Sequence, residues 1–345
     1  QAGGAGRDAG GRARTPGRGA AQGGRGVRWN NGGANTNLMP PSEAAVFNAT
    51  QLSDLDHLVL VAGHSVVTAE ALDDVDKQET AWYLEGYQRD QDLPLAFVGH
   101  IRRGVDAAAA DPRALLVFSG GQTRSAAGPR DEGSSYYRVA EHYGWWGHAD
   151  APPGARDTHP AVVDRRAAAG QALRAAAATR AAAERGAGAG GEPPLSVAQR
   201  TVTEDFAADS FQNLLFSLCR FKEVVGRYPA RVTVVSFDFK RRRFEELHRG
   251  ALRFPRSRFT YLGLQPPAQS RFNVSEAERG EMENAARSYE ADPYGCFTQA
   301  LTAKRDARNP FRRTTPYPLS CSDIKPLLEW CGPSLYPGSL PWGRA

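Results

Sequence analysis

Short apolar runs alternate along this chain with segments in which apolar residues recur every three or four positions. The runs that predict strands are 57–62, 114–118, 200–203, 231–237 and 258–263. A short, nearly continuous apolar run is typical of a strand that is buried on both faces, as in a parallel sheet. Alternation of such strands with helices predicts an α/β fold: a Rossmann-like doubly wound parallel sheet in a three-layer α/β/α sandwich, with a helical C-terminal extension.

The helices are predicted from apolar positions that repeat with a period near 3.6 residues. Within the sheet region we expect helices at 80–88, 95–110, 132–143, 208–227 and 240–251, and beyond it at 276–288, 296–304 and 323–331.

Composition divides the chain into three parts. A basic Gly/Ala/Arg-rich tail, residues 1–50, lacks the apolar content that would offset the entropy of ordering, and we expect it to be disordered. Residues 51–265 form the α/β domain, interrupted at 150–198 by an Ala-rich segment that we interpret as an exposed insertion. Residues 266–345 are a Pro-rich extension that we expect to pack on the domain.

The net charge of +5 is concentrated in the tail. Residues 1–37 contain six arginines and one aspartate, a difference of +5, so the remaining residues sum to zero. A balanced body gives no bulk electrostatic support for nucleic-acid binding, and we expect none by the folded part. The tail itself has two interpretations: the end of an organelle transit peptide, or an RNA-binding segment.

No apolar run approaches the length of about 20 residues that a membrane helix requires. The sequence starts without methionine, so we expect membrane association only through a segment that would precede it. Cytoplasmic and organellar locations both fit these features, and the sequence does not indicate an oligomeric state.

The four cysteines do not predict a metal site. Cys219, Cys296, Cys321 and Cys331 contain no C-x-x-C pair, the common spacing of zinc ligands, and we expect no metal. Cys219 lies on an apolar helix face and is expected in the core. For Cys321 and Cys331, reduced thiols are favoured over a disulfide between the two.

Three strand ends carry candidate chemistry, because ligands of an open parallel sheet sit beyond the carboxyl ends of its strands. At the first, Gly63 permits a tight turn and His64 is a candidate general base, since histidine titrates near neutral pH. The other interpretation is that His64 only bonds backbone groups of its loop.

The second strand end is a glycine turn. Its residues are Ser119, Gly120, Gly121, Gln122 and Thr123. Two glycines without Cβ atoms would let amide groups converge on an anion, and the two hydroxyls would add donors. The pattern matches neither the P-loop nor the dinucleotide fingerprint. We therefore expect a small-molecule ligand with an anionic group, without a specific identity.

The third strand end is acidic. Glu204 at its tip is a second acid–base candidate, and Ser210 and Asn213 follow on the next helix as candidate ligand-binding residues. The alternative is that carboxylates here cap the helix and interact with its dipole. Glu132 and Ser135 open another helix in the same crevice region.

Arginines follow the strand 231–237. Arg241, within the run 241–243, could neutralise a phosphate group on the ligand. An exposed basic helix start is the other interpretation.

The combination of these motifs is specific enough to compare with known families. It consists of Gly63, Ser119-Gly120-Gly121, Glu132, Ser135, Glu204, Ser210, Asn213 and the segment 234–243. This pattern resembles the YdcF/SanA/ElyC-like domain family. The eukaryotic branch of that family, known mainly from fungi and algae, is similar also in Trp82-Tyr-Leu-Glu85, Tyr87-Gln88, His100-Ile101, Asp292-Pro-Tyr-Gly-Cys296, Lys304-Arg305, Arg308-Asn-Pro-Phe311, Tyr317 and Leu327-Leu-Glu-Trp-Cys331.

The resemblance implies a Rossmann-like sandwich, a link of the bacterial members to cell-envelope biogenesis, and S-adenosylmethionine as a candidate cofactor. Two departures argue against a direct transfer of bacterial chemistry. Gln212 stands where bacterial members have a carboxylate, and Phe239-Lys240-Arg241-Arg242 replaces their His-x-x-Arg.

From these features we expect a protein that binds a nucleotide- or phosphate-bearing small molecule, either as a transferase or hydrolase or as a binding module without catalysis. The alternative is a membrane- or organelle-associated structural protein with a vestigial pocket. A serine hydrolase is disfavoured, because no serine lies in a G-x-S-x-G turn.

Overall fold

The computed structural model describes residues 51–146 and 195–343. The predicted tail, residues 1–50, and the part of the predicted insertion at 150–194 lie outside the described residues. Both interpretations therefore stay predictions.

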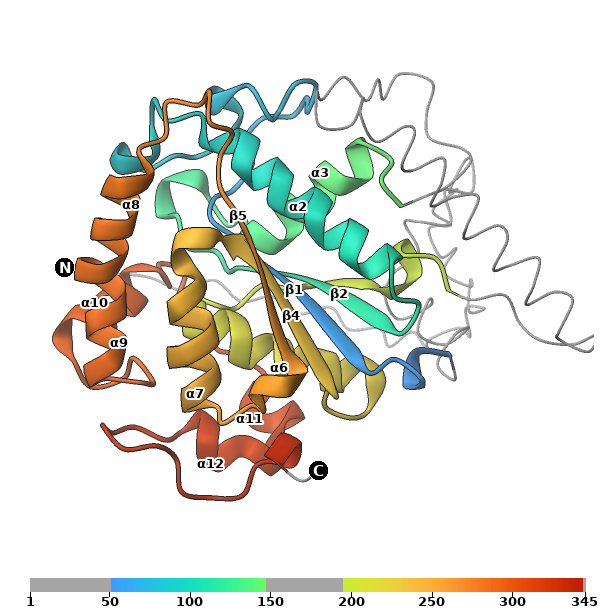
Figure 1. The fold of residues 1–345 in the computed structure, drawn as a ribbon, viewed down its shortest axis with the longest axis vertical. Coiled ribbons are helices and arrows are strands. Elements are labelled where there is room, and N and C mark those ends of the chain that lie inside the picture. The colour runs from blue at the N-terminus through green and yellow to red at the C-terminus, as the bar shows by residue number, and fades with distance from the viewer. Residues whose placement is uncertain (1–50, 147–194, 344–345) are drawn as a thin grey trace, which may run out of the picture. The chain divides into compact units, whose positions relative to one another are not determined.

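A sheet of five parallel strands forms the central layer (Figure 1). The strands are β1 (His57–Ala62), β2 (Ala114–Ser119), β3 (Thr201–Glu204), β4 (Arg231–Phe237) and β5 (Phe259–Leu264). Their order in the sheet is β3-β2-β1-β4-β5. Each strand lies within one or two residues of a predicted run, and the α/β class is confirmed.

Helices cover both faces of the sheet. On one face lie α2 (Leu93–Ala109) and α3 (Glu132–His142). On the other lie α6 (Ser210–Val225) and a helix that starts as a π-turn, Arg243–His248, and continues as α7 (Arg249–Ala251). Alternate residues of β1 pack against the helices on opposite faces of the sheet, because successive side chains on a strand point to opposite faces. Val59 and Val61 pack on the α2 side, and Leu58 and Leu60 on the α6 side, all without solvent exposure.

The strand order reverses between β1 and β4. The chain runs outward from β1 through α2 to β2 and through α3 to β3, and α6 then carries it back to β4 on the other side of β1. Neighbouring strands β1 and β4 therefore send their following segments to opposite faces. A topology of this kind leaves a crevice beyond the carboxyl ends of the two strands.

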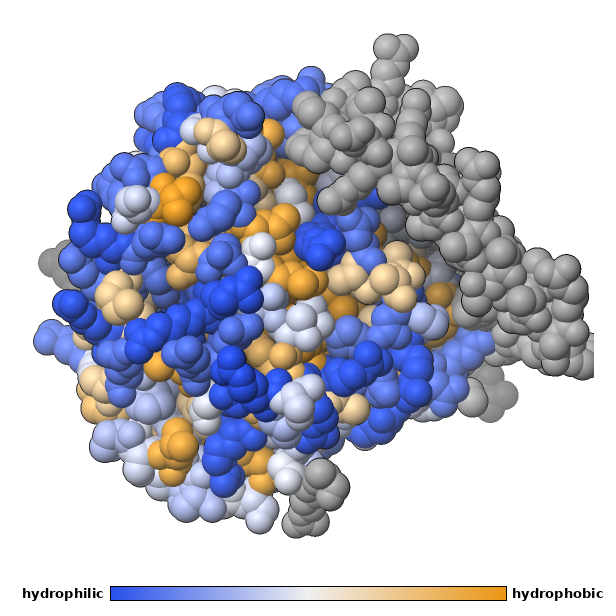
Figure 2. Space-filling view, viewed as in Figure 1, coloured by the Kyte–Doolittle hydropathy of each residue, from blue (hydrophilic) through white to orange (hydrophobic). Residues whose placement is uncertain are grey.

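The C-terminal extension is built into the core on the α6 side. Its helices are α8 (Val274–Glu281), a π-turn (Met282–Ala286), α9 (Arg287–Ala291), α10 (Gln299–Ala307), α11 (Tyr317–Ser320) and α12 (Lys325–Leu328). Tyr289, Tyr317, Leu327 and Trp342 are buried with the residues of α6. Figure 2 shows hydrophilic side chains over most of one face, with hydrophobic ones gathered near α2 and the edge strand β5.

Two of the predicted helices are wrong over the ranges given for them. At 80–88 the chain forms only short 3₁₀ turns, Glu79–Ala81 and Gly86–Gln88. Between them Trp82 pairs with Val67 in an antiparallel bridge and donates its indole N–H to the Val75 carbonyl at 2.8 Å. The segment 323–331, predicted as one helix, forms a 3₁₀ turn followed by α12. The helix ends before Cys331, which forms a disulfide.

The disulfide of Cys331 differs from the cysteine prediction. Cys331 forms a disulfide with Cys296, and their Cα atoms are 5.7 Å apart. Cys321 is a free thiol, buried like Cys219. The expectation of reduced thiols is confirmed for Cys321 and wrong for Cys331, and the alternative 321–331 disulfide is also wrong. The extension folds back and brings Cys296 and Cys331, 35 positions apart, into contact.

We predict that reduction of the 296–331 disulfide lowers the free energy of unfolding by about 2–4 kcal/mol, because the crosslink restricts the unfolded chain. Denaturant unfolding of oxidised and reduced protein measures this difference. Peptide mapping without reduction should yield the linked pair, while Cys219 and Cys321 react with an alkylating reagent only after unfolding. Coincident unfolding curves would contradict the assignment.

Candidate functional site

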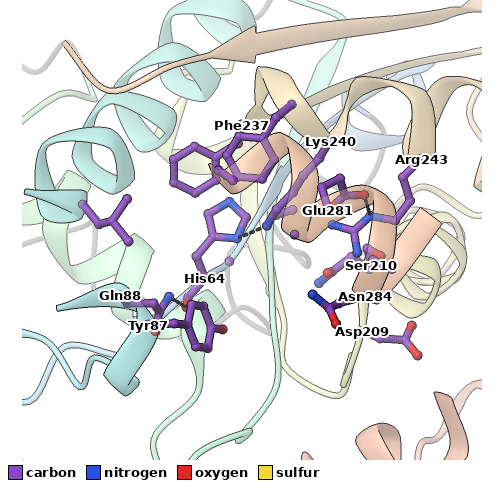
Figure 3. A pocket seen from close by; sticks show the side chains of 18 of the residues that line it. His64, Tyr87, Gln88, Asp209, Ser210, Phe237, Lys240, Arg243, Glu281 and Asn284 are labelled. Atoms are coloured by element: carbon purple, nitrogen blue, oxygen red, sulfur yellow. Dashed lines mark hydrogen bonds and ion pairs between the residues drawn. The ribbon is translucent and has the colours of Figure 1, made fainter. Parts of the chain in front are cut away.

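A cavity of about 620 Å³ opens at the reversal point of the sheet. The ends of β1 and β4 line it from the sheet, the start of α6 from one face, and α8 and α10 from the extension. The volume lies in the range of small-molecule sites. Figure 3 shows side chains from these separate elements converging on one space.

His64 lies where β1 ends. Its Nδ1 is 3.2 Å from Lys240 Nζ, and its Nε2 is 3.2 Å from Ser236 Oγ. Burial, together with the charge of Lys240, holds the pKa of His64 well below its usual range. The ring is therefore neutral at physiological pH, with Nδ1 able to accept a hydrogen bond from Lys240.

Lys240 reaches the cavity from the turn after β4. Burial lowers its pKa to about 7, and the neighbouring charge of Arg243 adds to the effect. Within the described residues no carboxylate lies at ion-pair distance from its Nζ. An amine in this setting exchanges its proton near neutral pH, unlike an exposed lysine.

Four further cations line the cavity, and one of them, Arg124, pairs with Glu85 at 3.2 Å. Arg243 is neutralised by Glu281, with Nε 2.9 Å from Oε1. Lys304 and Arg308 lie four residues apart, on one face of the C-terminal end of α10 and its cap, and neither has a carboxylate partner in the described parts of the chain. Burial and the charge of Arg308 lower the pKa of Lys304 to about 8.

The helix α10 is fixed in place by the residue between those two cations. Arg305 pairs with Asp209 at 2.6 Å. Asp209 is also the N-cap of α6, where its side chain accepts from the Gln212 amide at 2.9 Å. The same carboxylate thus caps α6 and holds Lys304 and Arg308 against the cavity.

One wall of the cavity is aromatic. Phe237, Phe239 and Phe272 have nearly parallel rings, with centroids 5.0 Å apart for the first two and 5.9 Å for each of the other pairs. A smaller hollow of about 320 Å³ adjoins the cavity and shares with it the residues Tyr87, Thr123, Arg124, Lys304 and Arg308. The cations without partners therefore stand between the two spaces.

The predicted site residues fall into two groups. Those that line the cavity are Gly63, His64, Thr123, Glu132, Ser210 and Asn213. Those that do not are Ser119, Gly120, Gly121, Gln122, Ser135, Glu204 and Arg241.

The predicted anion cradle of the glycine turn is wrong. The amide of Gly120 donates to the Glu204 carbonyl at 2.9 Å, and that of Gly121 to the Ala207 carbonyl at 2.8 Å. These donors are used inside the protein. The glycines instead make room for Glu132, since a Cβ at Gly63 or Gly120 would lie 2.6 Å from the Cβ of Glu132.

Glu204 is buried behind the cavity wall. It accepts hydrogen bonds from Ser119 Oγ at 2.6 Å, the Phe206 amide at 2.8 Å and the Tyr317 hydroxyl at 3.0 Å. Asn213 completes the group by donating to Ser119 Oγ at 2.8 Å. Burial raises the pKa of Glu204 to about 7 despite these donors. The predicted convergence of the second and third strand ends is present. It joins the core to the extension, and of Ser119, Glu204 and Asn213 only Asn213 lines the cavity.

Two other predicted residues have structural partners. Ser135 accepts from the Val67 amide at 3.0 Å and donates to the Asp131 carbonyl at 2.7 Å. Arg241 pairs with Asp238 at 2.6 Å and is not among the residues that line the cavity, whereas Arg243 is.

The sequence interpretation missed Lys240, Lys304, Arg308 and the contact between Ser210 Oγ and His248 Nε2, which are 2.8 Å apart. The pair Lys304 and Arg308, one helical turn apart in the extension, was the available signal. His248 stands inside a helix and gave none. Among the described residues no cluster of metal-ligating side chains is present, and no helix there is long and apolar enough to cross a membrane.

Comparison with known proteins gives one similarity to report. The chain is 30% identical to the "Uncharacterized protein YOR238W" of Saccharomyces cerevisiae over 248 residues, which cover 68% of this chain and 76% of the yeast protein. No protein-family model matches the chain. No solved structure matches it.

We predict that the Glu204 carboxyl makes the fold less stable as pH rises. Its folded pKa of about 7 exceeds the ordinary value of 4.5, so its contribution is complete below pH 4.5 and is lost through pH 7, a change of about 3 kcal/mol. Denaturant unfolding from pH 5 to 8 should show this decline in the wild type and a flatter profile in Glu204→Gln. The exposed Glu246→Gln is the control, and an unchanged slope in Glu204→Gln would refute the assignment.

Proposed function

This chain belongs to the same family as the yeast protein YOR238W, and on that premise we propose that it binds a phosphate-bearing small molecule in the cavity at the reversal point of the sheet. The observation that carries the proposal is the pair Lys304 and Arg308. Both face the cavity, and neither has a carboxylate partner among the residues described. Partly buried cations without counter-ions are costly, and a bound oxyanion would remove that cost.

Lysine usage in the whole chain supports this interpretation. The sequence contains five lysines. Lys77, Lys222 and Lys325 are paired at the surface with carboxylates. The other two line the cavity without such a partner. Among the lysines, the lack of a carboxylate partner is therefore confined to the two that line the cavity, and Lys304 is the one that lies beside Arg308.

The aromatic wall favours a ligand that also carries a flat ring. The rings of Phe237, Phe239 and Phe272 offer an apolar surface on which a nucleobase or similar heterocycle could stack. The phosphate would lie at Lys304 and Arg308, between the two hollows. A ligand of nucleotide size fits a cavity of about 620 Å³.

The resemblance to the YdcF/SanA/ElyC-like family adds S-adenosylmethionine as a rival ligand. Its sulfonium group is a cation, and it would share the cavity with five cationic residues. Arg124 and Arg243 are paired with carboxylates, whereas Lys240, Lys304 and Arg308 are not. The charge of the cavity therefore favours a phosphate ester over S-adenosylmethionine.

A thermal-shift screen with nucleotides, sugar phosphates, S-adenosylmethionine and inorganic phosphate tests the proposal. A phosphate-bearing ligand at a hundredfold excess over its Kd should stabilise the fold by about 2.7 kcal/mol. The double variant Lys304→Ala/Arg308→Ala should bind at least about 100-fold more weakly, at about 1.5–3 kcal/mol for each charged hydrogen bond.

The matched control removes two exposed cations away from the cavity, Arg279→Ala with Lys325→Ala, and should bind like the wild type. No shift with any phosphate compound, or equal loss in both double variants, would overturn the proposal and leave the alternative of a vestigial pocket.

Affinity for the phosphate ligand should fall as pH rises above about 8. The pKa of Lys304 is about 8, so it loses its positive charge there, whereas a phosphate ester gains its second charge near pH 6. Titrations from pH 5 to 10 should therefore show a maximum between about 6 and 8. In Lys304→Arg the decline above pH 8 should be absent or shifted upward, because arginine keeps its charge; the same alkaline decline in both proteins would refute the role of Lys304.

A further inference from the structure

The two lysines of the cavity differ in their surroundings. Lys304 lines both hollows beside Arg308, where the proposed phosphate lies. Lys240 lines only the inner cavity and lies at the end of the 3₁₀ turn Asp238–Lys240 that follows β4. The proposed anion binding at Lys304 and Arg308 therefore does not require Lys240, and the position of Lys240 needs its own explanation.

Lys240 is packed between aromatic rings and a neutral imidazole. Its Nζ is 5.3 Å from the ring centroid of Phe237 and 5.8 Å from that of Phe239. The only hydrogen-bond partner found for it in the described structure is His64 Nδ1, at 3.2 Å. Figure 3 shows the side chain directed at His64 beside Phe237.

The surroundings of Lys240 disfavour its protonated form. Burial removes water from the amine, and the charge of Arg243 repels an ammonium group. Glu281 attracts it and offsets part of this effect, and Arg308 and Lys304 add to the repulsion. A lysine placed in an apolar pocket next to other cations is the arrangement that exposes its lone pair for nucleophilic attack. His64, neutral for the same reason, can receive a proton from the amine and return it.

We infer that Lys240 is a nucleophile that forms an imine with an aldehyde or ketone, so that the natural ligand class is a phosphorylated carbonyl compound. The inference rests on the proposed phosphate binding at Lys304 and Arg308, which would place the carbonyl toward the inner cavity. The aromatic wall favours carbonyl compounds that are themselves aromatic.

The step balances without a further reactant. The Nζ lone pair attacks the carbonyl carbon and forms the C–N bond, and one proton passes from nitrogen through His64 Nδ1 to the former carbonyl oxygen. The resulting carbinolamine loses that oxygen as water, which carries away the second nitrogen proton, and the C=N bond forms. Hydrolysis reverses both steps and restores the free lysine.

Reductive trapping tests the inference on the full chain. The protein is incubated at pH 7 with pyridoxal 5′-phosphate, reduced with cyanoborohydride and digested for mass spectrometry, which separates all five lysines. We expect the adduct on Lys240 at least tenfold above the adducts on Lys77, Lys222 and Lys325. The rate of trapping should reach half its maximum near pH 7, and not near the ordinary lysine pKa of 10.5.

Variants distinguish the two proposals. Lys240→Arg should lose the adduct and keep the thermal shift with inorganic phosphate, which has no carbonyl group to react; Lys240→Met serves if the arginine variant fails to fold. Lys304→Ala/Arg308→Ala should slow trapping by glyceraldehyde 3-phosphate but not by glyceraldehyde.

Adducts spread evenly over the lysines, or concentrated on Lys304, would overturn the nucleophile while phosphate binding could persist. Trapping at Lys240 with no dependence on Lys304 and Arg308 would instead overturn the phosphate position and thereby the ligand class.

Discussion

The reversal of strand order between β1 and β4 is the constraint on which the site depends. Because the two strands are hydrogen-bonded neighbours, their last residues must lie side by side. Because their following segments leave toward opposite faces, no backbone closes the space above them. His64 after β1 and Lys240 after β4 meet across that space for topological reasons, although they are 176 positions apart in sequence.

The extension converts this crevice into an enclosed and charged cavity. Three kinds of contact attach the extension to the α/β domain. They are the ion pair of Arg305 with Asp209, the hydrogen bond of Tyr317 to Glu204, and the packing of buried apolar residues against α6. The ion pair uses Asp209 at the start of α6, and the hydrogen bond uses Glu204 at the end of β3. Glu204, which the sequence suggests as an acid–base residue, therefore helps to hold the extension against the sheet.

The sheet was predictable because parallel strands buried on both faces leave an uninterrupted apolar signal, as at 57–62. The cavity residues that follow strand ends, such as Gly63 and His64, were predictable for the same reason. Which backbone N–H groups remain free to bind a ligand was not predictable from the sequence. The amides of Gly120 and Gly121 find carbonyl partners only in the folded chain. The contributions of Lys304, and the pairing of Cys296 with Cys331, depend on how the extension folds back, and local sequence patterns carry no information on that path.

The last quarter of the chain supplies one wall of the cavity. During synthesis the cavity can therefore form only after the strands of the sheet have been made. The strands of the sheet are all complete by Leu264, so the α/β layers can assemble while the rest is still being made. The cavity acquires Lys304 and Arg308 only afterwards. A chain that stopped before α10 would contain every strand of the described sheet. It would lack Lys304 and Arg308 in the cavity, and also Tyr317, Leu327 and Trp342, which are buried against the α6 side of the sheet.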